Sequence, residues 1–320
     1  MNTNKNIVCL GGGVGTGNLL CGLKNDSHNL TVITSMADDG GSSGKLRKAY
    51  GIMPPGDIVN CIASLIPDEQ AELAELLLYR FPGEDLANKV IDGQKLGNLI
   101  MLAEIQRTGD FYKAIAVTQN IFGVTAELLP ATDERVELHA TTNDGRHIQS
   151  ETTLDLALYS EPHGLKSISI TPPNPKVNPR VTESMLEADV IISGPGDLYT
   201  NQLPVLVVPE VTEALLKSSA KKIFILNIAN KPFETKDFSL KDFMNAFSDH
   251  IGTFPFDTII LNNNFSVPIP QQYDYTYIKV DKELRDQKQS FSLIEEDLVQ
   301  ENFPLYHDSV KLAQVLKKHI

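Results

Sequence analysis

Short apolar runs recur along the chain and predict buried β-strands. They lie at Asn6–Leu10, Leu30–Thr34, Val190–Ser193, Lys222–Ile228 and Thr258–Leu261. Between several of these runs the apolar residues repeat with helical spacing, most clearly over Val211–Lys217 and Leu240–Phe247. Strands that alternate with helices favour an α/β fold built on a mostly parallel sheet, with helices on both of its faces.

A helical region separates the first two predicted strands from the later ones. It starts at Pro67-Asp68, runs through EQAELAELLLYRF and continues as an amphipathic pattern over Leu96–Thr108. A further helical pattern, over His307–Ile320, closes the chain. We therefore expect helices to dominate this region.

The segment after the helical region has β character. Two alternating segments flank Asn143-Asp144-Gly145, a strong turn sequence, and predict a β-hairpin. We interpret residues 125–170 as a β-rich insertion within a single domain that spans residues 1–320. Pro172–Pro179 holds too many prolines for a helix or a central strand, so we expect an extended return to the main sheet.

Composition and charge narrow the range of partners. The 320 residues, 42% of them hydrophobic, suit one large globular domain. A formal net charge of −13 repels phosphate backbones and anionic lipid, which argues against nucleic acid and against membrane insertion. The apolar run Ile7–Leu10 is too short for a signal-peptide core or a spanning helix, so we expect a cytoplasmic protein. Three cysteines without CxxC spacing favour small buried side chains over disulfides or zinc.

Ligands of an open parallel sheet bind beyond the carboxyl ends of its strands. Each predicted strand is followed there by glycine, small polar or acidic residues, so this edge is the predicted site. The loop after the first strand can bring backbone N–H groups close to a phosphate at the start of a helix. Its candidate residues are Gly11, Gly12, Gly13 and Gly15. The loop does not match the GxGxxG dinucleotide fingerprint, and a tight turn between strand and helix is the alternative.

The stretch ADDGGSSGKLR, after the second predicted strand, places two acids before a flexible turn and two cations. It is not a Walker P-loop, because Asp39 stands where that motif needs glycine and Leu46 where it needs serine or threonine. The acids can hold Mg²⁺ or ribose hydroxyls, while the turn and the cations face anionic oxygens. The candidate ligand-binding residues are Asp38, Asp39, Gly40, Gly41, Ser42, Ser43, Lys45 and Arg47.

Three further segments contribute candidates. Asp57, in PPGDIVN, is either a metal ligand or the N-cap of a helix, and Asn98, in QKLGN, lies either at a phosphate or in a simple turn. The loop GPGDLYTN can hold a base or a sugar, against the alternative that its tyrosine packs as an ordinary half-buried aromatic. Its candidates are Gly194, Gly196, Tyr199 and Thr200.

Several of these segments together resemble a known family. GGGVGTGNLLCGLK, MADDGGSSGKLR, PPGDIVNCI, KLGNLI and SGPGDLYTNQLP are similar, in this order, to the bacterial gluconeogenesis factor family, within the superfamily of 2-phospho-L-lactate transferase (CofD-like). The resemblance runs from about Ile7 to Asn264. It implies a Rossmann-like fold, a cytoplasmic location, a role in gluconeogenic growth and cell shape, and binding of UDP-sugars such as UDP-N-acetylglucosamine. The chain departs from the usual pattern at Val14-Gly15-Thr16-Gly17 and at Asp197, which adds a negative charge beside the expected diphosphate.

Two functions remain open. The phosphate loops, without a convincing nucleophile or general base, favour a regulator that binds a nucleotide sugar without turning it over and acts through an unidentified protein partner. The alternative is a Mg²⁺-dependent transferase that uses a nucleotide diphosphate-linked donor, since such transfer needs mainly positioning and charge neutralisation. The resemblance to the transferase branch implies Asp39 and Asp57 as its metal ligands. A homodimer is the general expectation for a protein of this kind.

Overall fold

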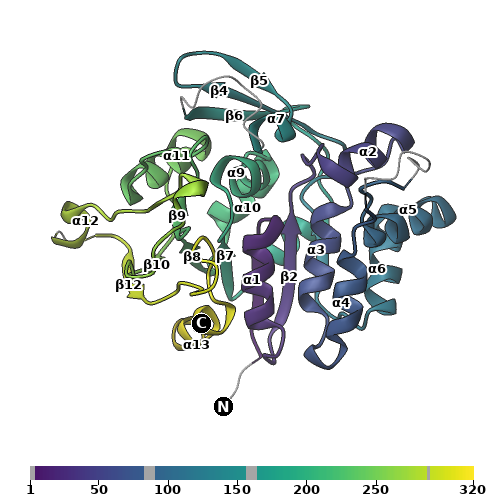
Figure 1. Cartoon of the computed structure of the whole chain (residues 1–320), viewed down its shortest axis with the longest axis horizontal. Helices are drawn as coiled ribbons and strands as arrows, with labels where there is room; N and C mark the ends of the chain where they lie inside the picture. Colours follow the sequence, from purple (N-terminus) through teal and green to yellow (C-terminus); the bar gives the residue numbers. More distant parts are fainter. Residues whose placement is uncertain (1–3, 83–90, 156–163, 287–288) are drawn as a thin grey trace.

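A parallel β-sheet forms the centre of the molecule (Figure 1). The computed structural model describes residues 4–82, 91–155, 164–286 and 289–320. In this part of the chain seven strands form the sheet, in the order β12-β10-β8-β7-β1-β2-β3. Their bounds are β1 Asn6–Leu10, β2 Asn29–Thr34, β3 Glu127–Pro130, β7 Val190–Ser193, β8 Lys221–Ile225, β10 Thr258–Asn262 and β12 Ser292–Glu296. All strand pairs are parallel.

The five predicted strands are confirmed, and the two edge strands β3 and β12 were not predicted. Four of the five residues of β1 and all of β10 are buried, because helices cover both faces of a parallel sheet. This is why the central strands appear in the sequence as uninterrupted apolar runs. The edge strand β12 is only half-buried and contains Glu295 and Glu296, so its sequence lacks that signal.

Helices lie on both faces of the sheet, as predicted. On one face α1 (Gly13–Leu23) packs against α3 (Gly56–Leu65) and α13 (Ser309–His319) (Figure 1). Another pair, α8 (Pro179–Leu186) and α10 (Pro209–Lys217), pack against each other. The predicted helical region is confirmed. It contains η1 (Asp68–Gln70), α4 (Ala71–Leu78), α5 (Leu96–Thr108) and α6 (Phe111–Ile121).

The remaining elements are short or lie near the carboxyl edge. They are α2 (Gly41–Tyr50), α7 (Glu151–Asp155), η2 (Leu198–Gln202), α9 (Leu203–Leu206), β9 (Ala229–Asn230), α11 (Leu240–Ile251), η3 (Gln271–Tyr273), β11 (Thr276–Tyr277) and α12 (Lys282–Asp286). The described helices include none with the length and hydropathy needed to cross a bilayer.

The predicted β-hairpin is present and belongs to a three-stranded antiparallel sheet. Strands β4 (Glu137–Thr142), β5 (His147–Gln149) and β6 (Leu165–Thr171) are ordered β5-β4-β6, and the sheet lies above the central sheet in Figure 1. Gly145, in the turn between β4 and β5, has φ 85°, which favours glycine. Of the predicted insertion 125–170, the first residues form β3 in the main sheet, and 156–163 lie outside the described residues.

Candidate functional site

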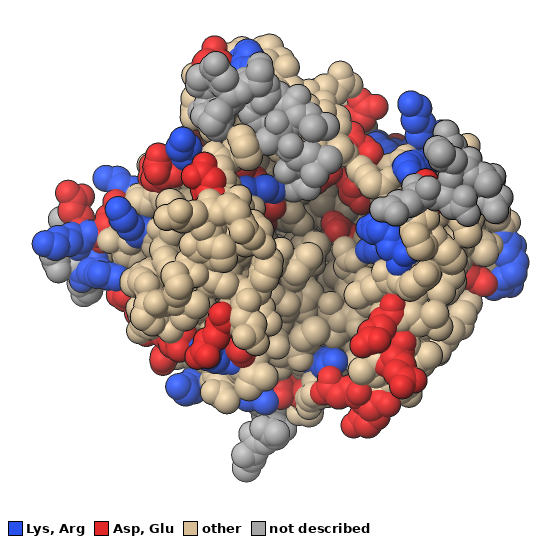
Figure 2. Space-filling model, in the orientation of Figure 1, with Lys and Arg blue, Asp and Glu red and all other residues tan. Residues whose placement is uncertain are grey.

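A cavity of about 650 Å³ opens at the carboxyl edge of the central sheet. It lies where β1 and β7 are neighbours and the strand order reverses, the position at which open α/β sheets bind ligands. Figure 2 shows the hollow near the centre of this face, with acidic and basic side chains around it. Of the residues predicted from sequence, those on its wall are Gly12, Gly13, Gly15, Asp38, Gly40, Gly41, Ser42, Ser43, Asp57, Asn98, Gly196 and Thr200.

Four helices begin at this cavity. The first residues of α1, α2 and α3, and Lys95 just before α5, line its wall. Helix N-termini carry partial positive charge and unpaired N–H groups, so their convergence makes the cavity favourable for an anion. For α1 and α2 this position follows from the topology, because each begins just after the carboxyl end of its preceding strand, β1 or β2.

Asp57 joins the start of α3 to the start of α1. Its Oδ1 accepts a hydrogen bond from the Gly13 N–H at 3.0 Å, and the N-cap position of α3 is Pro55. The interpretation of Asp57 as the N-cap of its own helix is therefore wrong: it lies in the first turn of α3 and satisfies a neighbouring helix. A Cβ on Gly12 would collide with this carboxylate, and a Cβ on Gly15 would lie 2.6 Å from the Pro195 carbonyl oxygen.

The N-terminus of α2 offers its backbone to the cavity. The N-cap is Gly40, and the cap makes no side-chain hydrogen bond. Ser42 and Ser43 are almost fully buried, and Ser42 Oγ donates to Gln94 Oε1 at 2.7 Å while accepting from the Lys95 N–H and from Asn98 Nδ2, each at 3.0 Å. These side chains attach α2 to α5. What they leave for a ligand is the backbone of the Gly-Gly-Ser-Ser turn.

Two opposite charges lie beside this turn. Asp38 Oδ1 accepts from the Gly40 N–H at 2.9 Å, and burial raises the pKa of the carboxyl above its ordinary value. Lys95 Nζ donates to Asn60 Oδ1 at 2.6 Å, and burial, followed by the nearby Arg80, lowers the pKa of its ammonium group. Burial disfavours the charged form of each side chain, so each charged form would be stabilised by a ligand or ion of opposite charge.

Six of the predicted residues do not line the cavity, and three of them, Asp39, Lys45 and Arg47, are charged. Asp39 Oδ1 accepts from Ser150 Oγ and from the N–H and Oγ1 of Thr152, so it stabilises the start of α7. Arg47 Nη2 donates to the Val136 carbonyl at 2.5 Å and Nη1 to three carbonyls of residues 36–38, which fixes the loop after β2. Lys45 is exposed and points to the Asp92 carbonyl at 3.3 Å. The expectation that both cations face the ligand is therefore corrected by their contacts.

The loop after β7 is held by buried internal partners. Tyr199 is only 2% exposed and packs edge-on against Phe238 and His250, as in the packing alternative. The N–H groups of Tyr199 and Thr200 donate to Glu234 Oε1 at 2.5 and 3.2 Å, so an internal carboxylate already occupies the start of η2. Gly194 (φ 81°) and Gly11 (φ 140°) shape the two strand ends without lining the cavity.

Asp197 does not leave an uncompensated negative charge beside the cavity. Its Oδ2 lies 2.8 Å from Lys231 Nζ, and Lys231 also lies 3.6 Å from Glu234 Oε2. The Lys231 side chain is 13% exposed and lines the cavity. The predicted change in local charge at position 197 is therefore largely cancelled by this ion pair.

Sequence reasoning missed several residues of the wall. They are Arg80, Lys95, Lys231, Tyr275, Tyr306 and His307. Lys95 lies within the predicted phosphate segment QKLGN, which is a signal that could have found it. The aromatic residues come from the C-terminal part of the chain, far in sequence from the glycine loops. His307 Nε2–H donates to the Leu226 carbonyl at 3.1 Å, and burial lowers the pKa of His307 to about 4, so the ring is neutral.

The donors suit a metal only in combination with a ligand. Among the described residues no group of three or more His, Cys, Asp or Glu side chains could hold an ion. Asp38 and Asp57 are both on the cavity wall, whereas Asp39 is not. Mg²⁺ is commonly held by one or two carboxylates together with water and substrate phosphates, so Asp38 and Asp57 are the carboxylates of the wall that could contribute to such a site.

Comparison with known proteins places the chain in a family. The family model described as 2-phospho-L-lactate transferase CofD matches residues 7–299. The gluconeogenesis factor of Bacillus subtilis (strain 168) is 36% identical over 322 residues, which cover 99% of this chain and 98% of that protein. A relative from Nostoc sp. is 39% identical over 259 residues, which cover 80% of this chain and 54% of that protein.

Solved structures agree with this result. The crystal structure of a member of the UPF0052 family from Bacillus halodurans superposes with a TM-score of 0.88 and 32% sequence identity, covering 98% of this chain and 99% of that one. The fold, the carboxyl-edge cavity and the sequence similarity over nearly the whole length point the same way. The chain therefore belongs to the CofD family and, within it, to the gluconeogenesis factors.

Proposed function

We propose that this protein is a regulator of carbon metabolism and cell shape that binds a UDP-sugar at the carboxyl-edge cavity without turning it over. The observation that carries the proposal is the start of α2, whose first-turn backbone borders the cavity with Lys95 and Arg80 on the same wall. A diphosphate needs such an arrangement of N–H groups and cations. The gluconeogenesis factor name of the Bacillus subtilis relative supports the metabolic role.

The two ends of such a ligand have separate surfaces. The diphosphate is placed at α2, and the base and sugar extend toward the far wall, where Tyr275, Tyr306 and Asn227 provide aromatic and amide groups. The cavity volume of about 650 Å³ lies in the range of small-molecule sites. A regulator of this kind acts through a protein partner that distinguishes the ligand-bound form, and a homodimer is compatible with it.

The second candidate is a Mg²⁺-dependent transferase acting on a nucleotide diphosphate-linked donor. It is favoured by Asp38 and Asp57, the two carboxylates on the wall near the proposed diphosphate position. We assign the metal to this pair instead of Asp39 and Asp57, because Asp39 is directed to α7. The ion, when bound, would neutralise phosphate charge, while the chain's own residues orient the donor and exclude water.

Thermal unfolding distinguishes the two functions. The purified protein is heated with UDP-N-acetylglucosamine, UDP-glucose, GDP, NAD or NADP, each with and without Mg²⁺, because a ligand that binds only the folded state raises the transition temperature. The regulator predicts a rise with UDP-sugars and no product on long incubation, followed by NMR. A rise with GDP that requires Mg²⁺, or steady conversion of a UDP-sugar, would favour the transferase. No rise with any of the nucleotides would contradict both.

A further inference from the structure

Two segments beside the mouth of the carboxyl-edge cavity differ in composition from the rest of the chain. The first covers residues 263–277, which follow β10 and end with β11, and the second covers residues 298–307, between β12 and α13. The whole chain has 13 Phe and 9 Tyr residues, and six of these aromatic residues lie in the two segments. Only two of their residues are Asp, Glu, Lys or Arg, although such residues make up 22% of the sequence. Aromatic enrichment with depletion of charge is typical of the core of a protein–protein interface.

Ring contacts join the two segments into one surface. The Tyr273 and Phe303 ring centroids are 5.9 Å apart in an edge-on arrangement, and Phe303 stacks on Tyr306 at 5.1 Å. In the first segment Phe265 packs edge-on against Tyr277 at 5.4 Å. We call these five side chains and the two segments that carry them the aromatic face. Figure 2 shows a mostly uncharged area beside the hollow, on the side where the yellow-green and yellow loops lie in Figure 1.

Two of these rings are exposed to solvent although they are large and apolar. The exposed fraction is 48% for Phe265 and 37% for Phe303, and Tyr273 and Tyr306 are half-buried. A single exposed aromatic residue is common on a protein surface, but contiguous exposed apolar surface marks an interaction site. The aromatic face therefore has the character of a surface that is covered when the protein binds a partner.

Hydrogen bonds within each segment hold the aromatic face in shape. Asn264 Oδ1 accepts from the Ser266 N–H at 3.0 Å and from Ser266 Oγ at 2.7 Å. In the second segment the Tyr306 N–H donates to the Phe303 carbonyl at 3.0 Å. A preformed surface loses less conformational entropy when it binds, so it favours association.

Charge favours a second copy of this chain as the occupant of the aromatic face. The chain carries a formal net charge of −13, so two copies repel one another wherever acidic surfaces meet. The aromatic face contributes only Asp274 and Glu301 to this repulsion. Rings that pack against rings need no charge of opposite sign, so the face can pair with itself, whereas a basic partner would gain little there.

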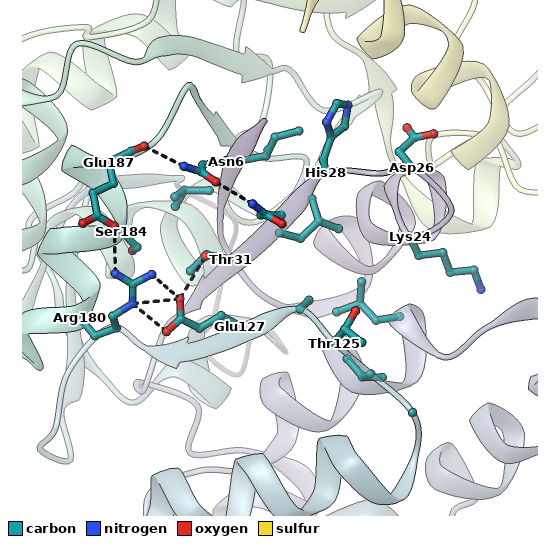
Figure 3. A pocket seen from close by; sticks show the side chains of 18 of the residues that line it. Asn6, Lys24, Asp26, His28, Thr31, Thr125, Glu127, Arg180, Ser184 and Glu187 are labelled. Carbon is teal, nitrogen blue, oxygen red and sulfur yellow. Dashed lines mark hydrogen bonds and ion pairs between the residues drawn. The ribbon is translucent and has the colours of Figure 1, made fainter. Parts of the chain in front are cut away.

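The opposite edge of the sheet offers a charged surface instead. A cavity at the amino ends of β1, β2 and β3 is lined by Lys24, Asp26, Glu127, Arg180 and Glu187 (Figure 3). Arg180 Nε lies 2.9 Å from Glu127 Oε1, and its Nη1 lies 3.1 Å from Glu187 Oε2. Arg180 and the two glutamates are thus paired within the chain, so a second copy that covered them would desolvate these charges without giving them new partners.

We propose that the aromatic face forms the interface of a symmetric homodimer. The same residues face each other across a two-fold axis, which is the commonest symmetry of soluble oligomers. A standard interface contains about 20–30 residues on each side, a number that the two segments supply. Tyr275 and Tyr306 belong to these segments and also line the carboxyl-edge cavity, so the two ligand sites open next to the interface. The interface does not depend on which ligand the cavity binds.

Sedimentation equilibrium of the purified, ligand-free protein tests this interface over concentrations from about 1 to 100 µM. The wild type should change from monomer to dimer as the concentration rises. Phe303→Ser and Phe265→Ser should each raise the dissociation constant of the dimer roughly tenfold or more, because buried aromatic residues carry much of the binding energy of an interface. Leu216→Ser is the matched control: Leu216 is 46% exposed on α10 and lies outside both segments, so this variant should dimerise like the wild type.

Hydrogen exchange locates the interface directly. Peptides from residues 263–277 and 298–307 should exchange more slowly at about 100 µM than at about 1 µM, while the peptide that contains Leu216 should not change. A monomer at every concentration overturns the proposal. So does a dimer that neither phenylalanine substitution weakens, a dimer that Leu216→Ser weakens equally, or one whose protected peptides lie elsewhere. Species that keep growing beyond the dimer would show open-ended association instead of two-fold symmetry. If Phe303→Ser unfolds because Tyr306 has lost its stacking partner, Phe265→Ser decides.

Discussion

Asp39 and its neighbour Asp38 differ in their contacts, and a substitution at Asp39 tests whether this residue has a structural role. We predict that Asp39→Ala lowers stability without removing the Mg²⁺ dependence of ligand binding. Oδ1 of Asp39 accepts three hydrogen bonds, from Ser150 Oγ (3.1 Å), the Thr152 N–H (2.9 Å) and Thr152 Oγ1 (2.8 Å). All three donors belong to the segment that connects β5 to α7 or to α7 itself.

The expected magnitude follows from these contacts. A hydrogen bond to a charged group contributes about 1.5–3 kcal/mol, but the three share one acceptor on a half-buried side chain, so their sum is reduced to about 2–4 kcal/mol. With an unfolding entropy of about 2.1 cal/mol/K per residue over 320 residues, this loss lowers the transition temperature by about 3–6 °C. Asp39→Asn keeps one acceptor oxygen and should lose less.

The assay is urea denaturation together with hydrogen exchange at the amide of Thr152. Exchange detects the case in which α7 opens locally without global unfolding. Asp110→Ala serves as the control, because Asp110 caps α6 through the single Lys113 N–H and should cost about 1 kcal/mol. The reasoning is refuted if Asp39→Ala unfolds like the wild type, keeps its Thr152 protection and loses Mg²⁺-dependent nucleotide binding.

Three further predictions concern the cavity wall. Gly15→Ala places a Cβ 2.6 Å from the Pro195 carbonyl oxygen, so it should lower the free energy of unfolding by about 1–3 kcal/mol and abolish nucleotide-induced stabilisation. Urea and calorimetric titrations of the variant that match those of the wild type would contradict this. Asp38→Asn should raise the free energy of unfolding at pH 7, because burial raises the pKa of Asp38 and its charged form costs stability once the pH exceeds that pKa. The same variant should weaken Mg²⁺-dependent binding roughly tenfold or more. A variant that is less stable in urea would contradict the expected cost of the buried carboxylate. Burial lowers the pKa of His307 to about 4, so the neutral ring contributes stability that is complete above about pH 6.5. About 3 kcal/mol of this stability is lost as the pH falls from 6.5 to 4. His307→Gln should flatten that part of the pH–stability curve, and an unchanged curve would exclude this role of His307.

The sequence was informative where one physical constraint dominates. Buried strands must be apolar, so β1, β2, β7, β8 and β10 could be located, and the topology of a parallel sheet then placed their loops together. The same logic could not find β12, because an edge strand with a polar face carries a weaker signal. Most of the glycines that line the cavity were likewise recognisable from their residue type and their place after a strand.

The roles of individual side chains within the site depend on contacts that no local sequence pattern reveals. Asp38 and Asp39 are adjacent and chemically identical, yet one lines the cavity and the other accepts hydrogen bonds at α7. Glu234 fills the start of η2 from a position far along the chain, which no local motif indicates. Tyr306 and His307 reach the cavity only through the packing of the C-terminal segment.

Binding of a UDP-sugar beside the start of α2 is tested by isothermal titration calorimetry of UDP-N-acetylglucosamine into the wild type, Lys95→Met and Lys48→Met. Lys95 lines the cavity beside the start of α2, whereas Lys48 is exposed near the end of that helix. We expect saturable binding that uridine alone does not reproduce, weakened roughly tenfold or more in Lys95→Met and unchanged in Lys48→Met. Absence of binding, or equal affinity in all three proteins, would contradict it.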